Sequence, residues 1–289
     1  MDALKTTLAN LIVTALETFD KMLGNASSIL SGAAGEIGGG VGVVPAAWAG
    51  IQGINSALQG FCYVIIAICL LIEIAQISSK VDVVRWETGL KICIKMVLSV
   101  VMIDLAPTIL TAIYRQSTHW VAAAAAGGGN LGALMQTRID TLIGGVNGFF
   151  AILGLFLSVF VVMLGIQICG MLISVMAYGR LFEIFAYLAV SPVPCAFFPL
   201  GGGSGFSRVT SKFFKAFAAV CLQAVMMIVC IRVFGEIIVG GIDTLAANVT
   251  ATGTAGVAEL AFLMLMGCIT LVMSMVKSGH WAKAILDAI

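Results

Sequence analysis

A long run without charge between Asp140 and Arg180 restricts the fold more than any other feature of the chain. Residues 141–179 contain no Asp, Glu, Lys or Arg, and most of their side chains are apolar. As a single helix the run would be about 58 Å long, nearly twice the roughly 30 Å hydrocarbon core of a bilayer. We therefore expect a membrane span that protrudes, tilts strongly or breaks.

The composition places the whole chain in the membrane class. Hydrophobic residues make up 61% of the 289 residues and charged residues 10%, against about 25% charged residues in soluble domains. We therefore predict an all-α, polytopic membrane helical bundle. The net charge of +1 provides no bulk attraction to nucleic acid.

The eight cysteines lie almost entirely in apolar stretches, where they are expected to act as small buried hydrophobes. They indicate neither a disulfide framework nor a metal site. We expect no catalytic residue, metal or cofactor, and leave open a bound phospholipid.

The first part of the chain has a different pattern. Residues 2–24 place apolar side chains at helical spacing, which predicts an amphipathic helix at the membrane interface or docked on a partner. Its short, polar-interrupted apolar stretch is unlike a signal peptide. Residues 25–47 are rich in Gly, Ala and Ser and predict a flexible connector. The expected domains are therefore residues 1–47 and a transmembrane domain, 48–289. The apolar stripe consists of Leu4, Leu8, Leu11, Ala15, Phe19 and Met22.

Five spans are expected, together with one broken segment. Residues 181–200 contain three prolines, and proline removes a backbone donor, so this stretch cannot be one straight helix. Broken backbone at membrane depth needs a cover of protein or a water-filled cavity, which predicts that copies of the chain pack together or surround something. The expected spans are about 55–78, 92–114, the uncharged run, 213–240 and 257–276, with loops at 115–140 and 241–256. The broken segment and the turn after it contain Pro192, Pro194, Pro199, Gly201, Gly202, Gly203 and Gly205.

Lysine and arginine predict the orientation, because they accumulate in cytoplasmic loops. With the N-terminus outside and residues 181–200 re-entering, ten lie on the cytoplasmic side and four outside. A full crossing by 181–200, giving six spans, remains the alternative. The cytoplasmic set is Lys80, Arg85, Lys91, Lys95, Arg180, Arg208, Lys212, Lys215, Lys277 and Lys283, and the outer set is Lys5, Lys21, Arg115 and Arg138.

Charged residues within the spans are candidate lumen or interface groups, because burying a charge in the bilayer is costly. Two pairs, Arg180 with Glu183 and Arg232 with Glu236, have the spacing that lets side chains meet on one helix face. Such pairs serve either packing or function. Glu73 and Asp104 have no partner close in sequence, and a proton or cation relay would need both at similar depth on facing helices.

Two further patterns follow the broken segment. Arg208, Lys212 and Lys215 alternate with phenylalanines and indicate either ordinary cytoplasmic anchoring, which we favour, or contact with DNA or anionic lipid. The glycine turn matches the GxSG of rhomboid-type intramembrane proteases at Ser204, with His280 as the available histidine. Because Ser204 does not enter a long helix there, we do not favour protease activity.

The order of these segments resembles the TrbL/VirB-six family, polytopic inner-membrane subunits of type IV secretion and conjugation machines. The residues that carry the resemblance lie at about 140–240: the long apolar span, then YLAVSPVPCAFFPL, a Gly/Ser turn, and SRVTSKFFKAFAAVCLQAVMMI. The chain lacks the large soluble extension of many members and looks like the compact versions of Gram-positive conjugative elements.

The resemblance implies a non-enzymatic subunit of a translocation channel in the bacterial cytoplasmic membrane. Implied partners are further copies of the chain, other secretion subunits including ATPases, membrane lipid, and single-stranded DNA or protein in transit. It also implies that the prolines form the broken segment and that Lys212, Phe213, Lys215 and Gln223 belong to the next helix. A self-contained small-solute or ion transporter is the alternative.

Overall fold

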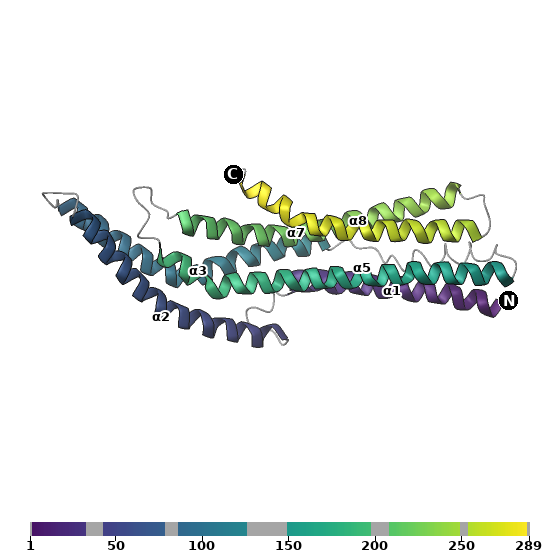
Figure 1. The fold of residues 1–289 in the computed structure, drawn as a ribbon, viewed down its shortest axis with the longest axis horizontal. Helices are drawn as coiled ribbons and strands as arrows, with labels where there is room; N and C mark the ends of the chain where they lie inside the picture. Colours follow the sequence, from purple (N-terminus) through teal and green to yellow (C-terminus); the bar gives the residue numbers. More distant parts are fainter. Residues whose placement is uncertain are drawn as a thin grey trace. The chain divides into compact units, whose positions relative to one another are not determined.

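The computed structural model describes residues 2–32, 43–78, 86–125, 149–197, 208–248 and 254–287, which are helical apart from single turn residues beside α6. The all-α prediction is confirmed. The helices are α1 (Asp2–Gly32), α2 (Val43–Ser78), α3 (Trp86–Ala125), α5 (Phe149–Val190), α6 (Pro192–Ala196), α7 (Arg208–Asn248) and α8 (Thr254–Asp287) (Figure 1).

Five helical stretches are long and apolar enough to cross a membrane, as predicted, although their ends differ from expectation. The second expected span does not end near Tyr114, because its helix α3 continues to Ala125. Helix α7 likewise continues to Asn248, so each helix takes up part of a predicted loop. The stretches are Ala49–Ala75, Ile92–Val121, Leu153–Ala196, Arg208–Ile238 and Ala261–Leu286.

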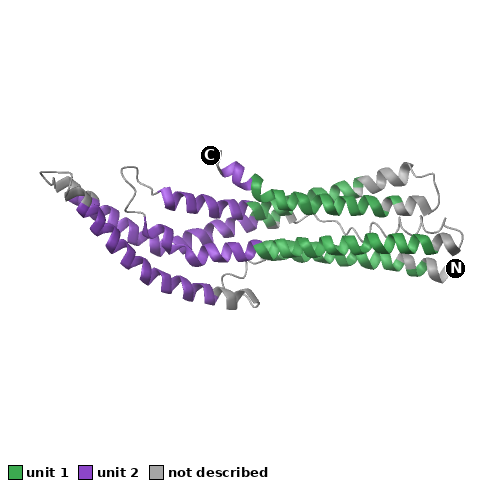
Figure 2. Cartoon of the chain, in the orientation of Figure 1, with its two compact units in different colours: residues 1–31, 120–179, 223–281 green, residues 32–119, 180–222, 282–289 purple. Residues whose placement is uncertain are grey.

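The helices form two compact units, shown in different colours in Figure 2. Unit 1 contains residues 1–31, 120–179 and 223–281, and unit 2 contains residues 32–119, 180–222 and 282–289. The predicted domain boundary between residues 47 and 48 falls inside α2 and stays a prediction.

Helix α1 is longer than predicted and docks on its own chain. Within unit 1 it lies beside α5 (Figure 1), where the side-chain amide of Gln167 donates a hydrogen bond to the Ala15 carbonyl at 2.8 Å. A Cβ at Gly170 would lie 2.7 Å from the Met22 sulfur and 3.1 Å from the Phe19 ring, so the missing side chain is what allows this approach. An apolar face of α1 thus packs inside the chain, where the interface or a partner was expected. The buried stripe is shifted from the predicted one and comprises Ile12, Leu16, Phe19, Leu23, Ala26 and Leu30.

The last two members of that stripe explain why α1 extends into the predicted connector. Ala26 and Leu30 continue the apolar spacing and are buried, so helix and packing reinforce each other up to Gly32. Helix α2 begins at Val43, and residues 33–42 lie outside the described part of the chain.

The uncharged run is helical and unbroken over residues 149–179, its described part. Of the three expected outcomes, protrusion or tilt therefore remains for this part of the run. A Cβ at Gly165 would lie 2.7 Å from the Leu265 side chain, so this glycine allows α5 and α8 to pack closely. Gly144 and Gly148, whose four-residue spacing in the uncharged run predicts close helix approach, lie outside the described residues.

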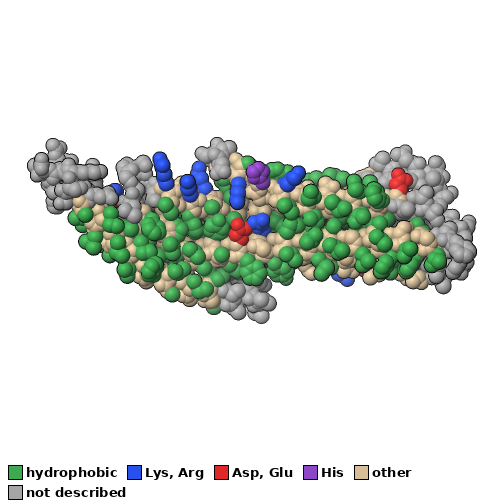
Figure 3. Space-filling view, viewed as in Figure 1, with side chains coloured by type: hydrophobic (Ala, Val, Ile, Leu, Met, Phe, Trp, Pro, Cys, Tyr) green, Lys and Arg blue, Asp and Glu red, His purple; other side chains and the backbone are tan. Residues whose placement is uncertain are grey.

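Large apolar side chains cover the outer surface of both units. Figure 3 shows one face on which hydrophobic side chains predominate and charged ones are few. Phe182 is 72% exposed and Leu157 67% exposed, and many other large hydrophobic residues of the spans are similarly open. Soluble monomers rarely present such continuous apolar surface, so we assign these faces to lipid or to other membrane proteins.

Candidate functional site

The proline break follows directly from α5. Helix α5 ends at Val190, Ser191 forms a turn, and α6 begins at Pro192. In an uninterrupted helix the Leu188 carbonyl would accept a hydrogen bond from the backbone N–H of residue 192, which a proline lacks. The Ser191 hydroxyl supplies one replacement, donating to the Leu188 oxygen at 2.9 Å.

A second replacement comes from a distant helix. The Nδ2 atom of Asn55 on α2 donates to the Leu188 oxygen at 2.9 Å and lies 3.2 Å from the Ser191 hydroxyl oxygen. Asn55 is only 7% exposed and Ser191 is fully buried, so these bonds form away from solvent. The Leu188 carbonyl, which Pro192 leaves without its helical donor, is thereby satisfied within unit 2.

The far side of the break is covered in the same way. The Thr210 hydroxyl of α7 donates to the Pro194 carbonyl at 2.9 Å, and Cys195 and Ala196 are fully buried in a cluster with residues of α2 and α3. The expected protein cover is therefore present and comes from this chain's own helices. Because the chain shelters its own break, the break gives no reason to infer that copies gather. Pro199 and the glycines of residues 201–205 lie outside the described residues.

The chain continues past the break in the same direction. Leu188 lies beside Asn55, and Cys195, seven residues further, belongs to one cluster with Cys62, seven residues further along α2. Helix α6 therefore runs parallel to α2 and completes the stretch Leu153–Ala196. This arrangement favours a single kinked crossing by residues 153–196, which keeps the number of candidate spans at five, over a segment that re-enters.

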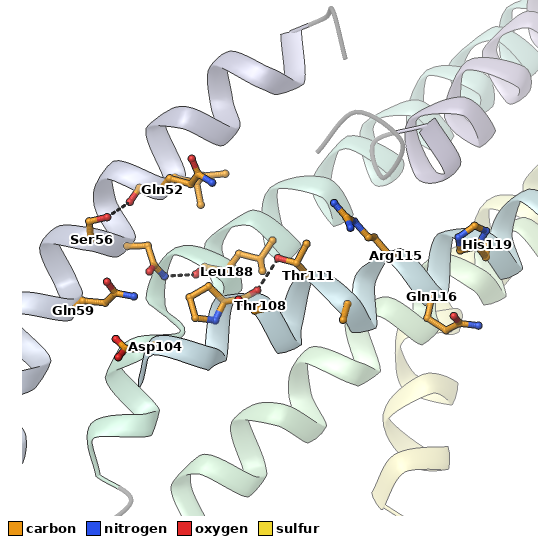
Figure 4. Close-up of a pocket in the computed structure, with 14 residues that line it drawn as sticks. Gln52, Ser56, Gln59, Asp104, Thr108, Thr111, Arg115, Gln116, His119 and Leu188 are labelled. Carbon is orange, nitrogen blue, oxygen red and sulfur yellow. Dashed lines mark hydrogen bonds between the residues drawn. The ribbon is translucent and has the colours of Figure 1, made fainter. Parts of the chain in front are cut away.

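A polar cavity of about 730 Å³ lies between α2 and α3, next to the hydrogen bonds that Asn55 and Ser191 make with the Leu188 carbonyl. Asn55 and Leu188 belong to both features. Figure 4 shows Gln52, Ser56 and Gln59 coming from α2, with Asp104 at one end of the α3 row and His119 at the other. The lining consists of Ile51, Gln52, Asn55, Ser56, Gln59, Asp104, Pro107, Thr108, Thr111, Ala112, Arg115, Gln116, His119 and Leu188.

Two contacts between charged or polar side chains fix how α2 and α3 face each other. The Tyr63 hydroxyl donates to Asp104 Oδ1 at 2.6 Å, and the Lys95 ammonium pairs with Glu73. Residues later in α2 meet residues earlier in α3, so the helices are antiparallel. Tyr63 and Asp104 each lie near the middle of their candidate spans, whereas His119 lies near the end of its span. The cavity therefore occupies one half of the span, from one membrane interface to mid-depth.

The same contacts show whether Glu73 and Asp104 lie at the similar depth that a proton or cation relay would need. Tyr63 and Glu73 are ten residues apart on α2, so Asp104 and Glu73 differ in depth by roughly 15 Å. The requirement of similar depth is not met. Each carboxylate instead has its own partner, which sequence proximity could not reveal.

The two predicted pairs behave differently. Arg180 and Glu183 form an ion pair on α5, as their spacing predicts. Arg232 is half-buried and Glu236 is exposed, and no ion pair joins these two described side chains of α7, although their spacing would allow one.

The basic patch lies at the start of α7, with Arg208, Lys212 and Lys215 exposed. The phenylalanines between them turn inward: the Phe213 ring centroid lies 5.5 Å from that of Tyr187, and Phe214 packs against the buried α6 cluster. These rings are engaged in packing rather than free to stack on nucleic-acid bases, which favours ordinary anchoring. Ser204 and Phe206 lie outside the described residues.

The cavity was missed from the sequence, although a signal was present. Gln52, Asn55, Ser56 and Gln59 recur at three- and four-residue spacing in a span, and Asp104, Thr108, Thr111 and Arg115 do the same in the next. Such spacing places each set on one helix face. Two polar faces in neighbouring spans indicate a shared polar space.

Fold and site together define a polytopic helical membrane protein with a proline-broken span beside a polar cavity. Residues 30–192 match the family described as TrbL/VirB6 plasmid conjugal transfer like protein, and the chain belongs to this family. Searches of curated proteins and of solved structures gave no match. The protein is thus a multi-pass bacterial membrane protein of conjugal transfer.

The matched residues locate the shared part of the chain. They include every residue that lines the cavity and end at Pro192, the first proline of the break. The basic patch and glycine turn lie beyond the match, which overlaps the resemblance at residues 140–240 only up to residue 192. The family match therefore covers the whole cavity lining together with all of α5.

Proposed function

We propose that the protein is a non-enzymatic membrane subunit of the translocation channel of a conjugative type IV secretion system. The family match over residues 30–192 carries this proposal. The lipid-facing surface and the kinked span fit a subunit embedded in a membrane machine.

The proposed assembly is a homo-oligomer around the channel axis. Its partners are other secretion subunits including the ATPases, membrane lipid, and single-stranded DNA or protein in transit. The family match supports this assembly. The proline break does not, because it is covered within the chain. No cofactor is proposed beyond a bound phospholipid.

The proposed orientation has the N-terminus outside and the C-terminus in the cytoplasm. Five crossings place the two ends on opposite sides, and the lysine and arginine distribution selects this sense. A green fluorescent protein fused to the C-terminus should fluoresce, and alkaline phosphatase fused there should be inactive. The reverse pair of results would contradict the orientation.

Deletion of the gene in a donor strain tests the role. Transfer of the conjugative element to recipients should be lost, and an intact copy in trans should restore it. Crosslinking in donor membranes should give multiples of the 30.1 kDa chain. Unchanged transfer frequency after deletion would reject the channel role, and a chain that crosslinks only as a monomer would reject the oligomer.

The polar cavity favours one second candidate, a self-contained transporter or ion channel. Its polar lining and Asp104 are features of solute pathways in membranes. Purified protein in liposomes should then move ions or a small solute without other subunits. Absence of flux, together with loss of conjugation on deletion, would favour the secretion role.

A further inference from the structure

We propose that the polar cavity of unit 2 is a binding site for a lysine or arginine side chain of a partner protein. The geometry assigns Asp104 as the group that receives the cation and Arg115 as the group at the opposite end. The cation site itself follows from the cavity. That the cation belongs to another secretion subunit rests on the function proposed above.

The space inside the cavity must be filled by water or by a polar ligand. Its lining side chains include amides, hydroxyls and charges within stretches assigned to the membrane, and Gln52, Ser56, Asp104, Thr108 and Arg115 are exposed rather than buried in protein. Polar groups facing hydrocarbon without hydrogen bonds are costly. Lining groups of this kind are therefore satisfied by water or by a polar ligand. The cavity volume of about 730 Å³ lies within the usual range of ligand pockets, about 300–1,000 Å³.

The cavity ends in the membrane rather than crossing it. Asp104 lies at mid-span, and the neighbouring cluster contains Cys62, Ile103 and Cys195, each fully buried and apolar. The next charged group on α2, Glu73, is already paired with Lys95 and stands roughly 15 Å further along the helix. A blind polar cavity suits a binding site better than a conducting path.

The charges select the ligand. Asp104 receives one hydrogen bond from Tyr63 and remains exposed to the cavity, so its carboxylate attracts a cation and repels phosphate. Arg115 stands eleven residues away on α3, roughly 16 Å along the axis and nearly on the same face. The carboxylate disfavours nucleic acid in the deep half of the cavity. A zwitterionic phospholipid headgroup has its phosphate and ammonium only two carbons apart, so it cannot reach both ends.

A polypeptide fits both ends and the middle. Its lysine or arginine would reach Asp104, its backbone would bond to the amides of Gln59 and Gln116, and a carboxylate further along would meet Arg115. An extended chain covers roughly 16 Å in five residues. The uncharged walls, which can both donate and accept, match peptide groups.

Charge-selective thiol labelling tests the cation site. Thr108 lies one turn from Asp104 and lines the cavity, so Thr108→Cys places a thiol beside the carboxylate. Purified full-length protein in nanodiscs is treated with 2-aminoethyl methanethiosulfonate or with its anionic 2-sulfonatoethyl counterpart. Each reagent transfers its thioalkyl group to the cysteine thiolate and releases methanesulfinate, and the aminoethyl group resembles the end of a lysine.

We expect the cationic reagent to modify the introduced cysteine about tenfold faster than the anionic one, as a carboxylate at short distance in a hydrated site would cause. Asp104→Asn in the same background should bring the ratio close to one. The protein without Thr108→Cys gives the background of the native cysteines. Leu105→Cys, next to Asp104 in sequence but outside the cavity, should be modified slowly and without charge preference.

Several results would overturn the proposal. They are no labelling of Thr108→Cys by either reagent, a preference for the anionic reagent, or a cation preference that survives Asp104→Asn. In donor cells, Asp104→Asn should lower the frequency of transfer at unchanged protein level, and Asp104→Glu should retain it. Normal transfer by Asp104→Asn would reject the proposal that a partner protein binds at this carboxylate. The deletion strain tests the channel role separately, so failure of labelling and failure of that role are distinguishable.

Discussion

Asn55 donates to the Leu188 carbonyl the hydrogen bond that residue 192, a proline, cannot donate. The two residues are 133 positions apart in sequence and 2.9 Å apart between donor and acceptor. The bond joins α2 to the broken span at one wall of the polar cavity. It therefore links the stability of the break to the shape of the candidate site.

Asn55→Ala should destabilise the protein by roughly 1–3 kcal/mol, the cost of leaving a buried polar group with one bond fewer. The measurement is the unfolding midpoint in detergent. Ser56→Ala is the matched control, because this exposed neighbour bonds only to its own helix at Gln52, and it should change the midpoint little. Pro192→Ala restores an N–H at residue 192, so Asn55→Ala should cost less in that background. If Asn55→Ala costs the same stability with and without Pro192→Ala, the Asn55 amide does not replace the missing backbone N–H of residue 192.

Replacing only Lys95 of the Glu73–Lys95 ion pair should destabilise the protein more than replacing both residues. Lys95→Met leaves the Glu73 carboxylate without its partner in a site where its side chain is 14% exposed, whereas the added Glu73→Gln removes the charge. We expect the double variant to recover roughly 1–2 kcal/mol of the loss. Chemical denaturation of the two variants compares them, and additive losses would argue against the pair.

Gly170→Ile should displace α1 from α5. The new side chain would meet Met22 and Phe19 at once, and overpacking of this kind costs roughly 1–3 kcal/mol. Limited proteolysis should cut α1 faster in this variant than in the parent protein. Gly154→Ile is the control, since no atom lies within 4 Å of a Cβ there. Identical digestion of both variants would mean that α1 does not depend on this contact.

Gln223→Met should leave stability unchanged or raise it. Gln223 is 3% exposed, and its Nε2 has no hydrogen-bond partner among the described residues, so the amide loses hydration without recovering a bond. Gly279→Ala should do the opposite, because its Cβ would lie 2.7 Å from that Nε2 atom. Thermal unfolding of both variants checks the signs. A clear loss of stability in Gln223→Met would show that the amide bonds to something in the assembled protein.

Acid should stabilise the region around Asp20. Burial raises the pKa of this α1 carboxyl above its usual range. Because the folded state holds the proton more tightly than the unfolded state, the contribution is fully present below the unfolded pKa and is lost as pH rises through the folded pKa. Asp20→Asn should therefore be more stable than the parent protein at pH 7, with the difference shrinking toward pH 4. A difference in unfolding midpoint that does not depend on pH would contradict this.

Several features with a local cause could be predicted from the sequence alone. Hydropathy over a span, the missing N–H of Pro192 and the spacing of Arg180 and Glu183 act within a few turns of chain, and five spans, the break and that ion pair are all present. The cover over the break was also foreseen as a requirement. Its source was not, because nothing in the sequence links Asn55 to Leu188 or Thr210 to Pro194.

The sequence was therefore enough to establish the class of protein, the number of its apolar spans and the position of the proline break. Which face of each helix meets which other helix depends on the packing of distant segments and was seen only in the folded chain. That choice paired Glu73 with Lys95, left Arg232 and Glu236 apart, docked α1 on α5 and turned two polar faces toward one cavity. The physical reason is that hydropathy is a property of the residues in a segment, whereas a contact depends on the rotation and depth of two segments relative to each other.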